Sequence, residues 1–278
     1  MTISLGTPAF TSDWNVCREQ NEARRRDPYG FLAYSAIYRL DQTPRRLFGL
    51  PGEWATGPEG PTVELGDSEE LTIDASAVTG RHTFAVVAER EFRRAARFGD
   101  IVIELSERGG VDLVRPIDPA HGLREWYVET PAYSPDPAWV IDAVFEPFDL
   151  SRDTAIEAAV EGITHSHRAV GEVVFELGGE EHRLLFLEAP RAGQPGAAFA
   201  VFTDSTSGVT TYRASRSLHT VLPVGGGPFA LDFNRAGNLQ CAYTDFSPCP
   251  LAPAQNKLPV PIEAGEKIPV FGTEHVGN

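Results

Sequence analysis

Apolar and polar residues alternate with a period of two over most of the middle of the chain. Runs of this kind occupy residues 62–65, 71–73, 83–87, 101–105 and 111–114, and residues typical of turns separate them. Because successive side chains of a β-strand point to opposite faces, this alternation predicts strands with one buried side. We therefore expect a mainly β fold, a barrel or sandwich of antiparallel hairpins.

Two segments interrupt the strand pattern with helical signals. The first is an N-terminal helix at about residues 12–27, where Ser12 or Asp13 can cap the helix and arginines occupy its last turn. This helix is mostly polar, so we expect it on the outside of the domain with Trp14 as its anchor. A second, shorter helix is predicted at residues 151–160.

The chain shows no composition change that would mark a domain boundary, so residues 1–278 are predicted to form one domain. A β-rich body covers about residues 60–235, and a proline-rich segment follows at about 236–271. Proline lacks the N–H that a central strand needs, so this segment is expected to wrap over the surface as an irregular C-terminal strap. The glycines at 225–227 indicate a hairpin turn.

Composition narrows the classes of partner. Hydrophobic residues make up 42% of the chain and aromatic residues 10%, which is enough for a large core and too much for a disordered protein. The net charge is -15 and no long basic run is present, so neither nucleic acid nor a membrane is an expected partner. Three cysteines without a disulfide framework, and a start unlike a signal peptide, predict a cytoplasmic protein.

Rare residue types stand in a fixed order through the C-terminal third. They are FTDSTSGVTTY at 202–212, RSL at 216–218, LDFNRA at 231–236, Asn238, CAY at 241–243, CPL at 249–251, NKL at 256–258 and AGEK at 264–267. This order resembles the family catalogued as domain of unknown function 1684, with weaker similarity upstream, at 113–118 and Arg124. The chain departs from that family's usual pattern at Gly237, Leu239, Gln240 and Ala252. The resemblance implies an ordered β-rich fold and no particular substrate.

Two carboxylates in apolar surroundings are the first candidates for chemistry. Asp204 follows an apolar strand, and Asp232 lies between Leu231 and Phe233. A buried carboxylate must be paired or hydrogen-bonded, or its pKa rises and it becomes neutral. In one interpretation these residues act as general bases in a pocket. In the other they belong to a structural ion-pair network, with Asp204 at the start of a turn.

Arginines are the expected partners of an anionic ligand. Arg115, Arg124 and Arg216 can each hold a carboxylate or phosphate through two parallel hydrogen bonds. Asn234 and Asn238 complete the predicted substrate-binding set, although the capping of turns is the commoner role of asparagine.

Tyr212 and Cys241 are the remaining catalytic candidates, and Tyr212 can equally be a core aromatic residue. Cys241 and Cys249 are interpreted as small buried residues, as catalytic or redox thiols, or as metal ligands, and their spacing disfavours zinc. His165 and His167 share one face of a strand. They are expected at an exposed strand start rather than on a metal, so no metal is predicted.

The chain contains no dinucleotide, phosphate-loop or serine-hydrolase motif. We expect an enzyme that acts on a small polar or anionic metabolite by acid–base chemistry, without an organic cofactor. The alternative is a non-catalytic ligand-binding or scaffold module in which the same polar residues only fix the strap. The enzyme hypothesis requires Arg115, Asp204, Arg216 and Asp232 to surround one hollow. Nothing in the sequence indicates an oligomeric state.

Overall fold

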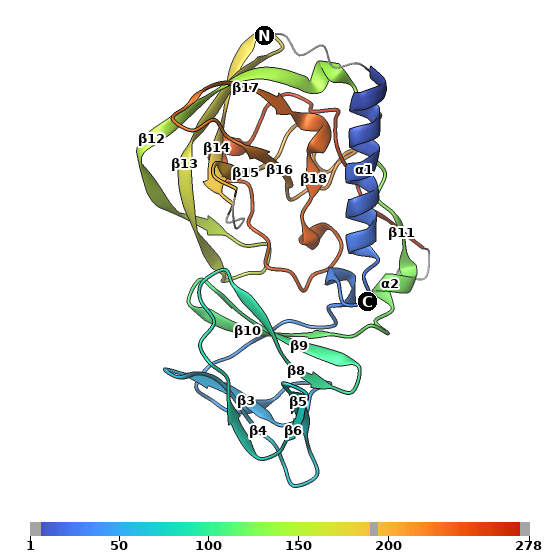
Figure 1. Ribbon diagram of the computed structural model, residues 1–278, viewed down its shortest axis with the longest axis vertical. Coiled ribbons are helices and arrows are strands. Elements are labelled where there is room, and N and C mark those ends of the chain that lie inside the picture. Colours follow the sequence, from blue (N-terminus) through green and yellow to red (C-terminus); the bar gives the residue numbers. More distant parts are fainter. Residues whose placement is uncertain (1–6, 190–193, 273–278) are drawn as a thin grey trace.

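Antiparallel strands provide most of the regular structure in the computed structural model, which describes residues 7–189 and 194–272. The predicted mainly β fold is confirmed, as open sheets in a sandwich-like arrangement rather than a closed barrel. The strands lie in two lobes (Figure 1). We call residues 38–117 the hairpin lobe, and helix α1 together with the chain after residue 117 the main lobe.

The hairpin lobe is built from two sheets, with strand orders β1-β10-β9-β8-β5-β6 and β2-β3-β4-β7. The strands are β1 (Tyr38–Arg39), β2 (Arg45–Arg46), β3 (Glu53–Gly57), β4 (Gly60–Glu64), β5 (Leu71–Ile73), β6 (Ser76–Val78), β7 (Arg81–Thr83), β8 (Phe92–Phe98), β9 (Ile101–Arg108) and β10 (Val111–Ile117). Trp54 and Ile103 are fully buried in its core. The predicted strand at 83–87 is wrong for most of its length, because β7 ends at Thr83.

One seven-stranded sheet forms the main lobe, in the order β17-β12-β13-β14-β15-β16-β18. Its strands are β12 (Val140–Glu157), β13 (Thr164–Leu177), β14 (Glu180–Glu188), β15 (Ala197–Phe202), β16 (Arg216–Val221), β17 (Gly227–Asp232) and β18 (Gly237–Asn238). Phe186 and Phe233 are fully buried in its core. β17 is at one end of this sheet and β16 is close to the other end, so the two strands do not pair with each other. The chain at residues 225–227 therefore crosses between distant strands and does not form the predicted hairpin turn.

β12 replaces the predicted second helix. Residues 151–157 belong to this strand, where Glu157 lies opposite Thr164 of β13. Ile156 is buried while both of its neighbours are exposed. Burial with a period of two therefore outweighs the capping signal of Ser151, and the helix prediction is wrong.

Helix α1 (Thr7–Arg25) lies along the main lobe (Figure 1). It begins earlier than predicted, so the expected caps at 12–13 lie inside the helix. Trp14 donates a hydrogen bond from Nε1 to the main-chain oxygen of Asn234 at 3.3 Å, which confirms it as an anchor. None of the helices in the described ranges is both long and apolar enough to cross a membrane.

The C-terminal strap, residues 236–271, is irregular as predicted. Its short regular pieces, and those elsewhere in the chain, are η1 (Phe31–Ala33), α2 (Leu123–Trp126), β11 (Tyr127–Glu129), η2 (Pro137–Trp139), η3 (Phe233–Arg235), η4 (Gln240–Ala242), η5 (Ala254–Asn256) and β19 (Val270–Phe271). Asn256 fastens the strap to the sheet, since it accepts a hydrogen bond from the Leu185 N–H at 2.7 Å and donates one to the Val201 oxygen at 2.9 Å.

The two lobes have separate large cores and share a smaller apolar contact. Leu113 of β10 packs with Ala158 and Ile163 of the main lobe. The organisation of residues 1–278 as one domain stays a prediction.

Candidate functional site

A cavity of about 380 Å³ lies where the hairpin lobe meets the main lobe and the strap. We call it the arginine cleft. It is lined by Tyr29, Gly30, Phe31 and Tyr34 before the hairpin lobe, by Arg90, Phe92, Arg94, Glu104, Arg108 and Arg115 of that lobe, by His165 and His167 of β13, and by Gln240, Ser247, Pro248, Cys249 and Pro250 of the strap. Segments far apart in the sequence therefore build one site.

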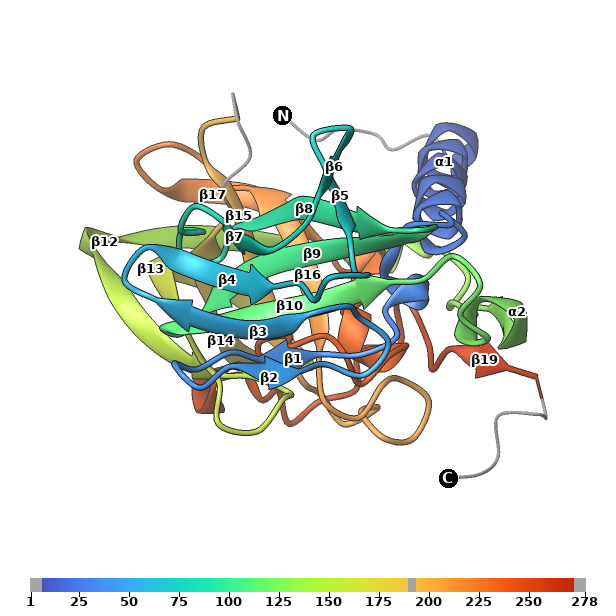
Figure 2. The same ribbon diagram turned by 90° about the horizontal axis from the view of Figure 1, so that it is seen from below.

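Strand register places two of the arginines on either side of one glutamate. Glu104 of β9 lies opposite Arg94 of β8 on one side and opposite Arg115 of β10 on the other. Figure 2 shows these three strands side by side. Residues opposite each other in adjacent strands point to the same face, so all three side chains point towards the cleft. Arg115 pairs with Glu104, and its guanidinium carbon lies 4.3 Å from the centre of the Tyr34 ring.

Arg90 and Arg108 line the cleft from the start and end of the β8–β9 segment. Arg90 has a φ of 66°, a left-handed conformation that costs a non-glycine residue about 1–3 kcal/mol and is often found at functional sites. Arg108 donates a hydrogen bond to the Glu91 oxygen at 2.7 Å. Burial, followed by the charge of Arg115, lowers the pKa of Arg108.

The cleft has an excess of positive charge. Four arginines and one carboxylate, that of Glu104, line it, in a chain whose net charge is -15. Burial, followed by the neighbouring Glu89 carboxylate, raises the pKa of Glu107 to about 7.

The two histidines of β13 are buried, which corrects the expectation of an exposed strand start. Their rings lie 5.5 Å apart between centroids, on one face of the strand as the spacing predicted. The Nε2 atom of His165 contacts the main-chain oxygen of Pro248. Burial, with the charge of Arg90 second, lowers the pKa of His167 to about 3, so its imidazole is neutral at physiological pH.

Buried polar atoms without a partner occur in these lining residues. They are Nε of Arg115 and both ring nitrogens of His167. A buried polar group without a hydrogen bond costs about 1–3 kcal/mol, so such atoms in a cavity wall favour the entry of a polar molecule. The described ranges contain no cluster of three or more histidine, cysteine or acidic residues that could hold a metal ion.

The strap closes the cleft with a cysteine. Cys249 lines the cavity, and its Sγ accepts a hydrogen bond from the Cys241 N–H at 3.2 Å. Cys241, the predicted catalytic cysteine, is not a lining residue. Tyr212 donates its hydroxyl hydrogen bond to the Cys241 oxygen at 2.7 Å, and burial raises the pKa of Tyr212 to about 12.

Asp204 and Arg216 lie elsewhere, in a fully buried ion pair that we call the Asp204–Arg216 network. Arg216 Nη2 donates to Asp204 Oδ2 at 2.8 Å, and the two side chains have no exposed surface. Arg216 also donates to the strap oxygens of Ile262, at 3.0 Å, and Ala264, while its Nε has no partner. Asp204 Oδ1 accepts from the N–H and hydroxyl groups of Thr206, as expected for a turn. These contacts hold the strap.

Asp232 and Asn234 form a third group, at the end of β17. Asp232 caps η3 by accepting a hydrogen bond from the Asn234 N–H at 3.0 Å, and it accepts another from Arg235 Nε at 3.2 Å. The Asn234 side chain accepts from the Asp136 N–H at 2.9 Å. Both residues therefore fix turns.

The other two predicted binding residues also contact the protein itself. Asn238 donates its side-chain hydrogen bond to the Lys267 oxygen at 2.7 Å, and Arg124 donates to the Pro119 oxygen. Of the nine predicted site residues, the arginine cleft contains only Arg115. Asp204 lines a separate open hollow of about 850 Å³, so the shared hollow expected from the sequence is not found.

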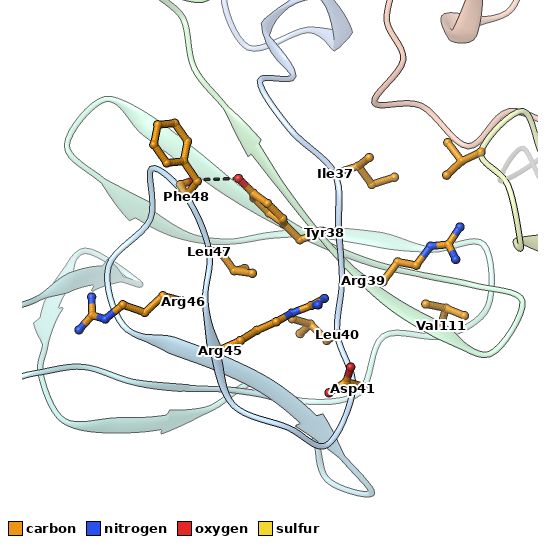
Figure 3. Close-up of a pocket in the computed structure, with 11 residues that line it drawn as sticks. Ile37, Tyr38, Arg39, Leu40, Asp41, Arg45, Arg46, Leu47, Phe48 and Val111 are labelled. Carbon is orange, nitrogen blue, oxygen red and sulfur yellow. Dashed lines mark hydrogen bonds between the residues drawn. The ribbon is translucent and has the colours of Figure 1, made fainter.

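Another hollow, of about 820 Å³, lies at the edge of the hairpin lobe (Figure 3). Its arginines are exposed, and the guanidinium groups of Arg39 and Arg46 point to opposite sides in Figure 3. Arg46 is also paired with Glu69 at 2.7 Å. This hollow lacks the convergent buried polar groups of the arginine cleft.

Sequence reasoning missed most of the cleft. Arg90, Arg94 and Arg108 follow no motif. His167 was expected at an exposed strand start, and Cys249 was left between a buried, a redox and a metal-binding role. One usable signal was Glu104, a charged residue inside the apolar run at 101–105. Such a carboxylate needs a partner on a neighbouring strand.

The comparisons with known proteins agree with the sequence pattern. The family described as "Protein of unknown function (DUF1684)" matches residues 125–267, a span that includes His165, His167 and Cys249. A solution NMR structure of an uncharacterised protein from gene locus rrnAC0354 of Haloarcula marismortui is 26% identical, with a TM-score of 0.43, over 50% of this chain and 76% of that chain. The search of curated proteins found no match. This chain belongs to the DUF1684 family.

Proposed function

We propose that this protein binds a small organic anion, carrying a carboxylate or phosphate group, in the arginine cleft and acts on it by acid–base chemistry without an organic cofactor. The observation that carries the proposal is the presence of four arginines and a single carboxylate in the wall of the cavity. Guanidinium groups bind carboxylates and phosphates through paired hydrogen bonds. A volume of about 380 Å³ falls within the usual range of small-molecule sites.

The apolar part of the wall supports an organic ligand rather than a bare inorganic ion. Tyr29, Phe31, Tyr34 and Phe92 line the cleft beside the arginines. Aromatic rings contribute apolar contact area, whereas the arginines supply orientation.

His167 is the group proposed for the acid–base step. Its imidazole is neutral because burial and Arg90 hold its pKa near 3. A bound anion would offset the charge of the arginines and raise the pKa of His167 towards neutrality. The ligand would thereby bring this imidazole closer to the range in which general acids and bases work best.

A non-catalytic binding module is the second candidate. It is favoured by the Asp204–Arg216 network, where the predicted base Asp204 already accepts hydrogen bonds from Thr206 and Arg216. In this alternative the network holds the strap, and the strap only completes a binding cleft. We also propose the cytoplasm as the location, on the basis of the three free cysteines.

Thermal unfolding with citrate, inorganic phosphate and uncharged sugars tests the binding proposal. A ligand that binds only the folded state at a concentration about one hundred times its Kd stabilises the protein by about 2.7 kcal/mol. Arg94→Gln should weaken anion binding by about tenfold, because it removes one cationic contact. Arg93→Gln is the matched control: the same charge is lost on the same strand, at a residue that does not line the cleft.

Two results would count against the proposal. One is the absence of any anion-specific rise in the melting temperature of the wild-type protein. The other is equal weakening of anion binding by Arg94→Gln and Arg93→Gln, which would indicate attraction by overall charge alone. Turnover of a bound anion that is lost in His167→Phe would separate the enzyme from the binding module.

A further inference from the structure

Two cysteines of the strap meet at the wall of the arginine cleft. The Cys241 N–H donates a hydrogen bond to Cys249 Sγ at 3.2 Å, so the two residues are in direct contact. The Sγ of a cysteine is only three bonds from its own main-chain nitrogen. Rotation of the Cys241 side chain therefore brings the two sulfurs together without a large movement of the strap.

The two thiols have different surroundings. Cys249 lines the cleft, so a small reagent in the cavity meets this residue first. Cys241 has the same exposure, 8%, but is not a lining residue of the cleft. The third cysteine, Cys17, lies on α1 and does not line the cleft.

The same surroundings favour the thiolate at Cys249. The hydrogen bond from the Cys241 side chain lowers the pKa of Cys249, with main-chain N–H groups and the charge of Arg115 adding to it against the effect of burial. The hydrogen bond with Cys249, and then burial, raise the pKa of Cys241. A thiolate beside a positive charge is the reactive form of cysteine, so the pair has a nucleophile on the cavity side and a thiol behind it.

We propose that Cys249 and Cys241 form a redox-active dithiol, which a hydroperoxide entering the arginine cleft converts into a disulfide. The Cys249 thiolate attacks the outer peroxide oxygen; the S–O bond forms, the O–O bond breaks, and the released alkoxide takes a proton from water. The Cys241 thiol then attacks the Cys249 sulfur, the S–S bond forms, and the departing hydroxide takes the thiol proton. Overall, two thiols and one hydroperoxide give a disulfide, an alcohol and water.

This inference does not rest on the proposed anion-binding function. It uses the cleft only as the route by which a small oxidant reaches Cys249. Failure of every anion to bind would leave the dithiol intact, and the experiment below is therefore done in a buffer free of phosphate and carboxylates.

The native full-length protein is treated with hydrogen peroxide, its remaining thiols are alkylated, and its peptides are mapped by mass spectrometry. The expected product is a Cys241–Cys249 linked peptide that a dithiol reductant reverses, with Cys17 still alkylated. In Cys241→Ala, dimedone should label a sulfenic acid on Cys249. In the matched variant Cys249→Ala, labelling of Cys241 should be at least about tenfold slower.

The mapping of the wild-type protein decides the question even if a variant folds poorly. Oxidation of Cys17 while Cys241 and Cys249 remain alkylatable would overturn the proposal. Equal dimedone labelling of Cys241 and Cys249 in the two variants would overturn the assignment of Cys249 as the nucleophile.

Discussion

The Asp204–Arg216 network and the arginine cleft both bury an arginine against a carboxylate, yet they use it differently. In the network one carboxylate meets one arginine, both side chains have no exposed surface, and the remaining hydrogen bonds of Arg216 go to strap carbonyls. In the cleft Glu104 is the one lining carboxylate for four arginines, and Arg115 borders a cavity.

Charge balance is what distinguishes the two regions. A buried pair with matched charge needs no counter-ion from solution, so the network serves the fold. An excess of guanidinium groups around a cavity is stabilised by an anion from outside, so the cleft is suited to binding. A charged residue inside an apolar stretch of sequence needs a partner. Only the tertiary surroundings decide whether that partner is another residue of the protein or a ligand from solution.

The largest expected effect is on stability, from breaking the network. Arg216→Met leaves Asp204 buried without its cation and should lower the free energy of unfolding by about 3–5 kcal/mol in urea denaturation. The affinity of the folded protein for an anion should change little, because Arg216 does not line the cleft.

Arg235→Gln is the control for this variant. Arg235 pairs with Asp232 at 3.2 Å, but 42% of its side chain is exposed, so its loss should cost less than about 1 kcal/mol. An Arg216→Met protein as stable as Arg235→Gln, or one with weakened anion binding, would remove the contrast between the two regions.

The second effect comes from His167 and depends on pH. In the unfolded chain this histidine titrates near 6.5, whereas in the folded protein its pKa is about 3. Below pH 6.5 the unfolded state takes up a proton that the folded state does not, so His167 destabilises the fold as the pH falls from 6.5 to 3. The loss can reach about 4 kcal/mol, and it is absent above pH 6.5.

His167→Phe should remove this contribution, because it keeps an aromatic ring beside Phe199 and has no titrating group. Urea denaturation of both proteins between pH 7 and pH 4 measures the difference, and NMR titration of the imidazole gives its pKa directly. A His167 pKa near 6.5 in the folded protein would show that the imidazole is well solvated and would weaken the cleft as a dry binding site.

The smallest effect concerns the contact between the lobes. Gly109 has a φ of 61°, and a Cβ there would overlap the main-chain oxygen of Thr164 in β13. Gly109→Ala should therefore move the β9–β10 turn away from β13, lower stability by about 2 kcal/mol and weaken anion binding.

Gly110→Ala is its matched control. Gly110 has a φ of 76°, but a Cβ there would meet nothing within 4 Å. Gly110→Ala should therefore lower stability by only about 1 kcal/mol, through backbone strain, and leave anion binding unchanged. Equal anion affinity in the two variants would mean that the contact of this turn with Thr164 does not shape the cleft.

Local pattern was enough to predict much of the fold. Alternation of apolar and polar residues predicted the strand at 71–73 and the β9–β10 hairpin, and Trp14 was correctly expected to anchor α1. The pattern failed at 151–160, where capping residues at the start of a polar stretch indicated a helix. The alternation of buried and exposed residues continues through this segment, and residues 151–157 belong to β12. It also failed at 225–227, because glycines favour a turn without specifying which strands the turn joins.

The candidate site was predictable only in its residue types. Composition and apolar neighbours indicated that arginines and carboxylates would be buried. Arg115 lines the arginine cleft, and its role in binding stays a prediction. The pairing of Asp204 with Arg216 was one of the alternatives left open by the sequence. Buried charge can be recognised in a sequence, whereas its partner usually cannot, because the two residues belong to different strands.

By itself, the sequence determined that this is a mainly β protein with one N-terminal helix and an irregular strap, because burial with a period of two is a local property of the chain. Tertiary structure alone decided which charged residues share a cavity. Arg94, His167 and Cys249 come from the hairpin lobe, the main sheet and the strap. They meet because of strand register and the packing of one lobe against the other, which depend on the whole chain rather than on any one segment.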